Sequence, residues 1–207
     1  MWLRRALRIT MVTAAMGAAS LAVAAPASAA PAAPAVLAPA TDPHPADAAA
    51  DLEGGRTTLV LDAGTAGVLT DNGVSVSPTG DAHPSGGGIS FPITGGEVVP
   101  STLAGTIEHS GGLEFRAGGT TLGVQDFVID TVAGVLTARV SGTDTRVPLL
   151  NLSLADASIK TQDNGFTVDG VRGTLTAEAA AALNATFGVD LFSAGLPVGT
   201  ADVEACI

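Results

Sequence analysis

The sequence of 207 residues contains no tyrosine, one tryptophan and one cysteine. The tryptophan is Trp2, inside an N-terminal segment that we expect to be removed, so phenylalanine is the only large aromatic residue of the expected mature chain. Stacking platforms for sugars and nucleic-acid bases need aromatic side chains, so this scarcity argues against such ligands. The lone cysteine, Cys206, cannot form a disulfide framework within the chain.

Basic residues are scarce as well, with nine lysines and arginines against 20 aspartates and glutamates. Three of the nine, Arg4, Arg5 and Arg8, lie in the segment expected to be removed, which leaves six basic residues and a net charge of −14. A chain this acidic is not expected to bind nucleic acid or an anionic membrane surface.

The N-terminal segment has the three parts of a secretory signal. Its arginines precede an alanine-rich apolar stretch at 11–23, and Ala27-Ser28-Ala29 is a small-residue cleavage site. We therefore expect 1–29 to be a signal peptide, the mature chain to begin at Ala30, and the protein to be secreted or exposed at the cell surface. The paired arginines leave open whether export follows the general or the twin-arginine route.

After the signal, residues 30–55 are rich in alanine, proline and aspartate without periodicity, which predicts a disordered spacer. The remaining residues, 56–207, suffice for one domain with its own core. No run in this part approaches the ~20 apolar residues that span a bilayer, so the processed chain is not expected to be transmembrane.

Most of the domain alternates between apolar and polar residues with a period of two. Capping residues mark two exceptions: Asp62 precedes a helix expected at 63–71, and Thr176 precedes one at 177–187. Glycine, asparagine and aspartate interrupt the alternation at short intervals. The pattern predicts a mostly β fold, an antiparallel β-sandwich or flattened barrel with two short flanking helices, of which we favour the sandwich. A shift in the apolar positions also predicts a bulge near Asp126.

The segment 103–117 reads as a central hairpin. A three-residue loop around Gly111 would pair His109 with Leu113 and Ile107 with Phe115, which keeps one face apolar. The same register would place Glu108 opposite Glu114 on the outer face, where two carboxylates could bind a cation or form a solvated surface pair.

His109 is the candidate site residue, since it lies on the apolar face at the end of the expected hairpin. Two interpretations stay open. The imidazole is hydrogen-bonded to a neighbouring loop as a structural group, or it is a ligand for a metal or haem iron. His83, next to a proline, is expected to be exposed. The sequence contains no catalytic constellation, phosphate loop or paired metal-ligand histidines, so we predict no enzymatic activity.

The motif Gly105-Thr106-Ile107, followed by His109, Gly111 and Leu113, resembles the G-x-V…G-H-x-G-x-L signature of HtaA domains. The whole stretch 57–203 also resembles a group of actinobacterial secreted proteins, through the segments ISFPITGG, AGTIEHSGGLEF, DFVIDT, LTARV and ALNATFGV. The resemblance implies a β-sandwich of haem-uptake proteins, in which a tyrosine ligates iron and a histidine assists. His109 matches that histidine. The sequence departs from the family in having Glu108 in place of a glycine and no tyrosine.

The resemblance therefore implies a secreted or cell-envelope, non-enzymatic domain that binds haem or iron. His109 would be the iron ligand in the absence of tyrosine, and Ile107, Leu113 and Phe115 would line the haem slot. The alternative function is an envelope structural or adhesion module without a small-molecule ligand, binding a cell-envelope component through an exposed strand edge at 89–94.

Overall fold

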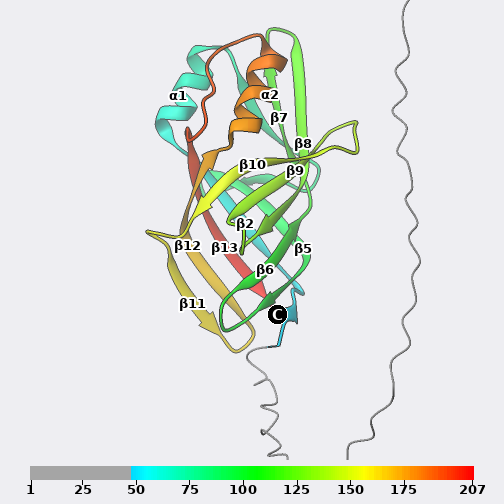
Figure 1. Ribbon diagram of the computed structural model, residues 1–207, viewed down its shortest axis with the longest axis vertical. Helices are drawn as coiled ribbons and strands as arrows, with labels where there is room; N and C mark the ends of the chain where they lie inside the picture. The colour runs from blue at the N-terminus through cyan, green and yellow to red at the C-terminus, as the bar shows by residue number, and fades with distance from the viewer. Residues whose placement is uncertain (1–47) are drawn as a thin grey trace, which may run out of the picture. The chain divides into compact units, whose positions relative to one another are not determined.

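The computed structural model describes residues 48–207. The expected signal peptide lies outside this range, as does the expected spacer up to residue 47, and regular structure begins at Ala50. The described part is mostly antiparallel strand (Figure 1). The strands are β1 Ala50–Asp51, β2 Gly54–Leu61, β3 Ser75–Thr79, β4 His83–Ser85, β5 Gly88–Val99, β6 Ala104–His109, β7 Gly112–Ala117, β8 Thr120–Asp130, β9 Val135–Val140, β10 Arg146–Ser153, β11 Ser158–Gln162, β12 Gly165–Leu175 and β13 Pro197–Cys206.

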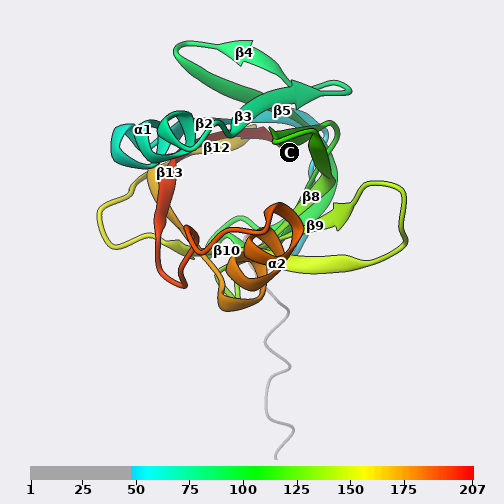
Figure 2. The same ribbon diagram turned by 90° about the horizontal axis from the view of Figure 1, so that it is seen from above.

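Eight of these strands close into a barrel, so the favoured β-sandwich is wrong. The hydrogen-bonded ring runs β5, β2, β13, β12, β10, β9, β8 and β6, and β6 closes it by pairing with β5 on one side and β8 on the other. Figure 2 shows the strands as a ring around the barrel axis. Register shifts in β5, β8, β10 and β12 mark bulges, which bend strands and increase their twist. A period of two is common to sandwiches and barrels, so only the long-range pairing distinguishes them.

Both expected helices are confirmed. Helix α1 spans Ala63–Asp71, and the Asp62 carboxylate accepts a hydrogen bond from the Thr65 N–H at 3.0 Å. Helix α2 spans Ala177–Phe187, and the Thr176 hydroxyl oxygen accepts one from the Ala179 N–H at 3.1 Å. Each cap satisfies a backbone donor that the first helical turn leaves free. Helix α2 packs on β10 and lies across part of the upper opening of the barrel (Figure 2).

The expected central hairpin is wrong. Strands β6 and β7 do not pair with each other; both run antiparallel to β8, one after the other along its length. The break between them is at Gly111, whose φ is +82° and where a Cβ atom would lie 2.4 Å from the Ala82 N. Glycine serves this close approach and not a reversal of the chain. The β8 bulge opposite, at Asp126, is confirmed by the register shift and a φ of +53°.

The true reversal follows β7. Gly118 and Gly119 form a two-residue loop with φ angles of +55° and +87°, and the flanking Ala117 and Thr120 are paired. Positive φ at both central residues is the geometry that matches the right-handed twist of a hairpin.

The segment 89–94, expected to be an exposed strand edge in the adhesion alternative, lies on β5 and is paired on both sides. Pro92 and its neighbours on β5 pair with β2, while β4 and β6 pair along the other side of the strand. The expected exposed edge at 89–94 is therefore wrong. A register shift between Ile93 and Gly95 marks a bulge in β5 next to Pro92. The described residues contain no helix long and apolar enough to cross a membrane.

Candidate binding site in the barrel

The side chain of His109 is buried in the barrel, with 5% of its surface exposed. Its Nε2 lies 2.7 Å from the Thr57 Oγ1 on β2, and its Nδ1 lies 3.2 Å from the Phe127 carbonyl oxygen on β8. Both ring nitrogens are therefore engaged, by two strands that lie on different sides of β6. His83, by contrast, is exposed as expected.

The partners fix the proton arrangement of the ring. A carbonyl oxygen only accepts, so the Nδ1–H of His109 donates to Phe127, and Nε2 accepts from the Thr57 hydroxyl. Burial removes water from the imidazole and lowers its pKa to about 4, although the hydrogen bond to the Phe127 carbonyl opposes this shift. His109 is consequently neutral at physiological pH, with no lone pair free for a ligand.

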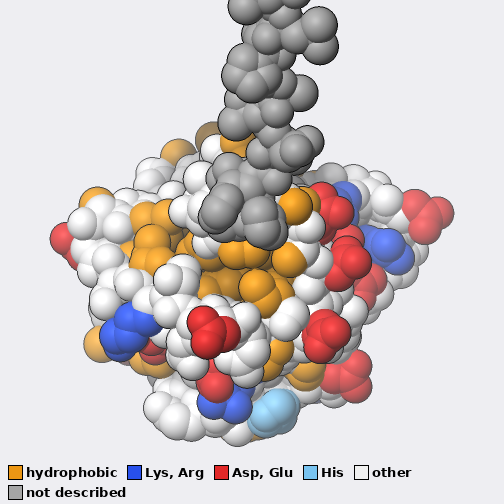
Figure 3. Space-filling view, turned by 90° about the horizontal axis from the view of Figure 1, so that it is seen from below, with side chains coloured by type: hydrophobic (Ala, Val, Ile, Leu, Met, Phe, Trp, Pro, Cys, Tyr) orange, Lys and Arg blue, Asp and Glu red, His pale blue; other side chains and the backbone are white. Residues whose placement is uncertain are grey.

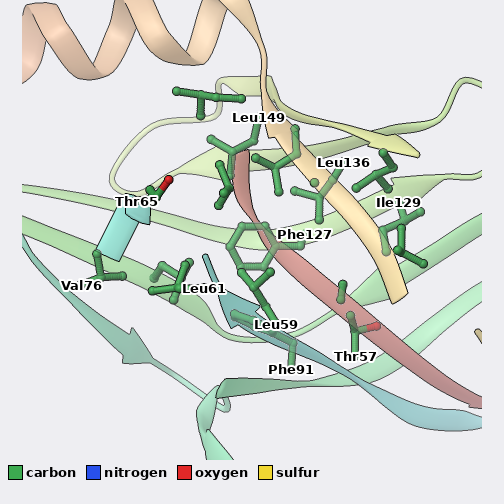
Figure 4. A pocket seen from close by; sticks show the side chains of 18 of the residues that line it. Thr57, Leu59, Leu61, Thr65, Val76, Phe91, Phe127, Ile129, Leu136 and Leu149 are labelled. Carbon is green, nitrogen blue, oxygen red and sulfur yellow. The ribbon is translucent and has the colours of Figure 1, made fainter. Parts of the chain in front are cut away.

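A cavity of about 100 Å³ lies inside the barrel. Figure 4 shows its aliphatic and aromatic side chains converging from strands on all sides. Thr57, Thr65 and His109 are the polar side chains of the lining, and the Thr65 hydroxyl donates to the Pro197 carbonyl. Its hydrophobic lining consists of Leu59, Leu61, Leu69, Val76, Phe91, Leu113, Phe115, Phe127, Ile129, Leu136, Leu149, Leu150, Leu152, Val171, Leu175, Leu183, Phe192, Leu196, Val198, Ala201 and Val203.

Three of the four candidate residues meet in this cavity. His109, Leu113 and Phe115 line it, whereas Ile107 lines a second cavity of about 300 Å³ at the lower end of the barrel. The two cavities share a wall formed by Ile129, Leu152, Val171 and Val203.

Sequence reasoning missed the two partners of the imidazole. Thr57 lies 52 positions before His109, and Phe127 follows the Asp126 bulge, which turns its carbonyl group out of regular pairing. Phe127 also meets Phe91 edge to face, with ring centroids 5.1 Å apart. The bulge could be predicted from the sequence. The contact between Thr57 and His109 could not, because the two residues are far apart in the chain.

The expected facing pair of Glu108 and Glu114 is wrong. Glu108 on β6 lies opposite Val128, while Glu114 on β7 lies opposite Gly123 and forms an ion pair with Arg116 at 2.6 Å. The two carboxylates do not face each other because β6 and β7 pair with successive parts of β8 and not with each other. Among residues 48–207, no three histidine, cysteine, aspartate or glutamate side chains form a group that could hold a metal ion.

This barrel can be compared with known proteins. The sequence model of one family, described as Htaa, matches residues 65–190. The chain belongs to the HtaA family. The segment whose sequence resembles the HtaA signature lies on β6 and the start of β7, and its histidine, His109, is buried. Comparison with curated protein sequences gives no match.

Solved structures of HtaA domains share the fold. The C-terminal domain of HtaA from Corynebacterium glutamicum is 14% identical with a TM-score of 0.57, over 75% of this chain and 98% of that domain. The N-terminal domain of the same protein is 16% identical with a TM-score of 0.51, over 75% and 98%. The haem-binding protein HtaB from the same organism is 11% identical with a TM-score of 0.46, over 77% and 96%. At such identities the likeness to the two HtaA domains shows the fold alone.

Proposed function

We propose that the protein is a non-enzymatic HtaA-family binding module of the cell exterior, which holds an uncharged apolar ligand in its barrel and does not coordinate haem iron. The observation that carries the proposal is the apolar cavity in which both ring nitrogens of the one histidine, His109, are hydrogen-bonded within the protein. Eight strands enclose an interior that side chains can fill or that can hold one small ligand.

The residues of the barrel do not fit the haem that the family implies. The sequence has no tyrosine to supply a phenolate, and His109 has no free lone pair because Thr57 donates to Nε2. The cavity at His109, about 100 Å³, is also far smaller than a haem macrocycle. Iron coordination at His109 would require breaking the Thr57 hydrogen bond and displacing the surrounding core.

A ligand in this cavity would be bound mainly by apolar contact with the lining side chains. The side chains of the lining are aliphatic or aromatic apart from two threonines and the neutral imidazole, so they offer no charge to a ligand. An apolar cavity of about 150 Å³ in another protein stays dry and binds benzene. A cavity of similar chemistry, which shares part of its wall with a larger one below, therefore favours a small uncharged molecule.

Binding can be measured with the neutral dye N-phenyl-1-naphthylamine, whose fluorescence rises in apolar surroundings. The folded domain, residues 48–207, is expected to give a saturable increase at one equivalent that 1-decanol reverses by competition. The same protein unfolded in urea serves as the control and is expected to give no saturable signal. A folded domain that leaves the dye fluorescence unchanged would contradict the proposal.

The exterior location rests on residues 1–29, whose basic, apolar and small-residue parts follow the order of a secretory signal. Expression of the full chain in an actinobacterial host is expected to yield a processed protein in the medium or cell envelope that begins at Ala30. N-terminal sequencing checks this. An intact chain beginning at Met1 in the cytosol would refute the location.

A further inference from the structure

The second cavity lies at the lower end of the barrel, opposite α2, and has a volume of about 300 Å³. Its lining comes from the β5–β6 turn, the β8–β9 turn and the strands β6, β8 and β10 to β13. Leu154 and Ile159, at the start of the β10–β11 connection and on β11, are 52% and 50% exposed. On this lower face hydrophobic side chains gather in a hollow with acidic and basic side chains around it (Figure 3).

Leu103 in the β5–β6 turn lines this cavity and has an unusual backbone conformation. Its φ is +56°, in the left-handed region, and its N–H donates to the Val99 carbonyl at 2.7 Å. Glycine or asparagine adopts this conformation with far less strain than a leucine does. The leucine side chain lines the cavity, so a strained backbone here presents an apolar side chain to the space.

The two polar side chains of the cavity, Thr102 and Thr131, already make hydrogen bonds to the backbone. The Thr131 hydroxyl donates to the Gly105 carbonyl at 3.0 Å and accepts from the Gly105 N–H at 2.7 Å. The Thr102 oxygen accepts from the Ala104 N–H at 3.3 Å. Apart from these two hydroxyl groups the lining side chains carry no hydrogen-bonding atoms, so they offer little to a polar ligand body, whereas a hydrocarbon needs no such partner.

The charges beside the mouth disfavour an anionic head group. Arg172 binds Asp156 at 2.9 Å, and Lys160 binds Asp169 at 3.1 Å, so both nearby cations already have carboxylate partners. The Asp130 carboxylate, next to Thr131, accepts from two backbone N–H groups of its own turn. A carboxylate or phosphate placed here would meet a chain with a large excess of acidic residues.

The mouth does offer main-chain groups to a neutral head group. Strand β11 pairs only with β12 among the described strands. A two-residue loop joins them, so Gln162 and Gly165 form a hydrogen-bonded pair, and the alternate residues Ile159 and Thr161 direct their N–H and C=O groups to the open side.

We propose that the second cavity binds a single uncharged hydrocarbon chain, such as that of a fatty alcohol, with its hydroxyl group at the mouth beside β11. The shared wall of Ile129, Leu152, Val171 and Val203 lets a longer chain extend toward the first cavity when these side chains move. This inference rests on the proposed function and names the ligand class and the entrance.

The test is a titration of the folded domain with 1-hexanol, 1-octanol and 1-decanol, and with octanoate and decanoate, by displacement of N-phenyl-1-naphthylamine. The Kd is expected to fall about fourfold for each added methylene group, as the burial of one methylene predicts. Each alkanoate is expected to bind at least tenfold more weakly than the alcohol of equal length. Equal or tighter binding of the alkanoates would overturn the inference.

Two variants locate the site, and one is a matched control. Ile159→Glu places a carboxylate at the mouth and is expected to raise the Kd of 1-decanol at least tenfold, and Leu103→Gly at least fivefold. Val132→Glu adds the same charge on the β8–β9 turn, at a side chain 76% exposed and outside the lining, and is expected to change the Kd less than twofold.

The outcomes separate the two proposals. If the dye and 1-decanol bind but Ile159→Glu and Leu103→Gly leave both affinities unchanged, the ligand lies in the first cavity, and the second-cavity inference is overturned while the proposed function stands. If neither binds to the folded domain, both are overturned. Circular dichroism of each variant confirms that the compared proteins are folded.

Discussion

Lowering the pH from 7 to 4 is expected to reduce the free energy of unfolding by about 3 kcal/mol through His109 alone. The pKa of this imidazole is lowered by burial from 6.5 in the unfolded chain to about 4 in the folded barrel. Between these values the unfolded state binds the extra proton, so stability is fully present above pH 6.5 and is lost as the pH falls to 4. No other side chain that lines the cavity is ionisable, so no neighbouring charge offsets the loss.

The variant His109→Leu isolates this contribution. At pH 7 it is expected to be less stable than the natural protein by about 2–3 kcal/mol, because the Thr57 hydroxyl and the Phe127 carbonyl lose their partner in the core. Since leucine does not titrate, the difference is expected to shrink as the pH falls and to vanish near pH 4.

Urea unfolding at pH 7, 6, 5 and 4 measures both proteins. His83→Gln is the control, because His83 is exposed and its replacement is expected to leave the stability unchanged at each pH. A difference between the natural protein and His109→Leu that stays constant across the series would refute the buried neutral imidazole.

Gly96→Ala is expected to destabilise the barrel by at least about 3 kcal/mol. Gly96 lies on β5 with a φ of +115°, and a Cβ atom there would lie 2.2 Å from the Thr106 carbonyl oxygen and 3.0 Å from the Ile107 Cα. These are backbone atoms of β6, so they cannot move without opening the β5–β6 pair. That pair closes the ring, and its loss would expose the core around Ile107.

The neighbouring glycine provides the control. A Cβ atom at Gly95 would meet only the Glu108 Oε2, at 3.6 Å, and the φ of Gly95 is not positive. Gly95→Ala is therefore expected to change the free energy of unfolding by less than about 1 kcal/mol. Thermal unfolding of the two variants compares them directly, and equal effects would contradict the closure described here.

The sequence was most informative where structure is local. Asp62 and Thr176 correctly marked the helix starts, because a cap needs only residues within one turn. The glycine pairs were less informative. The pattern predicts a three-residue hairpin loop at Ser110-Gly111-Gly112, but Gly111 lies at a strand break and Gly112 begins β7, whereas Gly118-Gly119 forms the hairpin. Positive φ suits turns, bulges and close approaches alike, so the partner strand decides which one a glycine forms.

The candidate site shows the same limit. The alternation placed His109 on the inner face, and it is buried there. Whether the imidazole was a ligand or a structural group depended on Thr57 and Phe127, which reach it only after the barrel closes. Closure of the ring joins β2 to β13, from opposite ends of the described chain, through a pairing that no local pattern encodes. This explains why sandwich and barrel could not be separated from sequence.

The most direct test of the account is a haemin titration of the natural domain and of His109→Leu, followed by the Soret absorbance. The account predicts no saturable shift at one equivalent for the natural domain and the same spectra for the variant, because His109 has no free lone pair. A Soret shift that saturates at one equivalent in the natural domain and disappears in folded His109→Leu would contradict it and would make His109 an iron ligand.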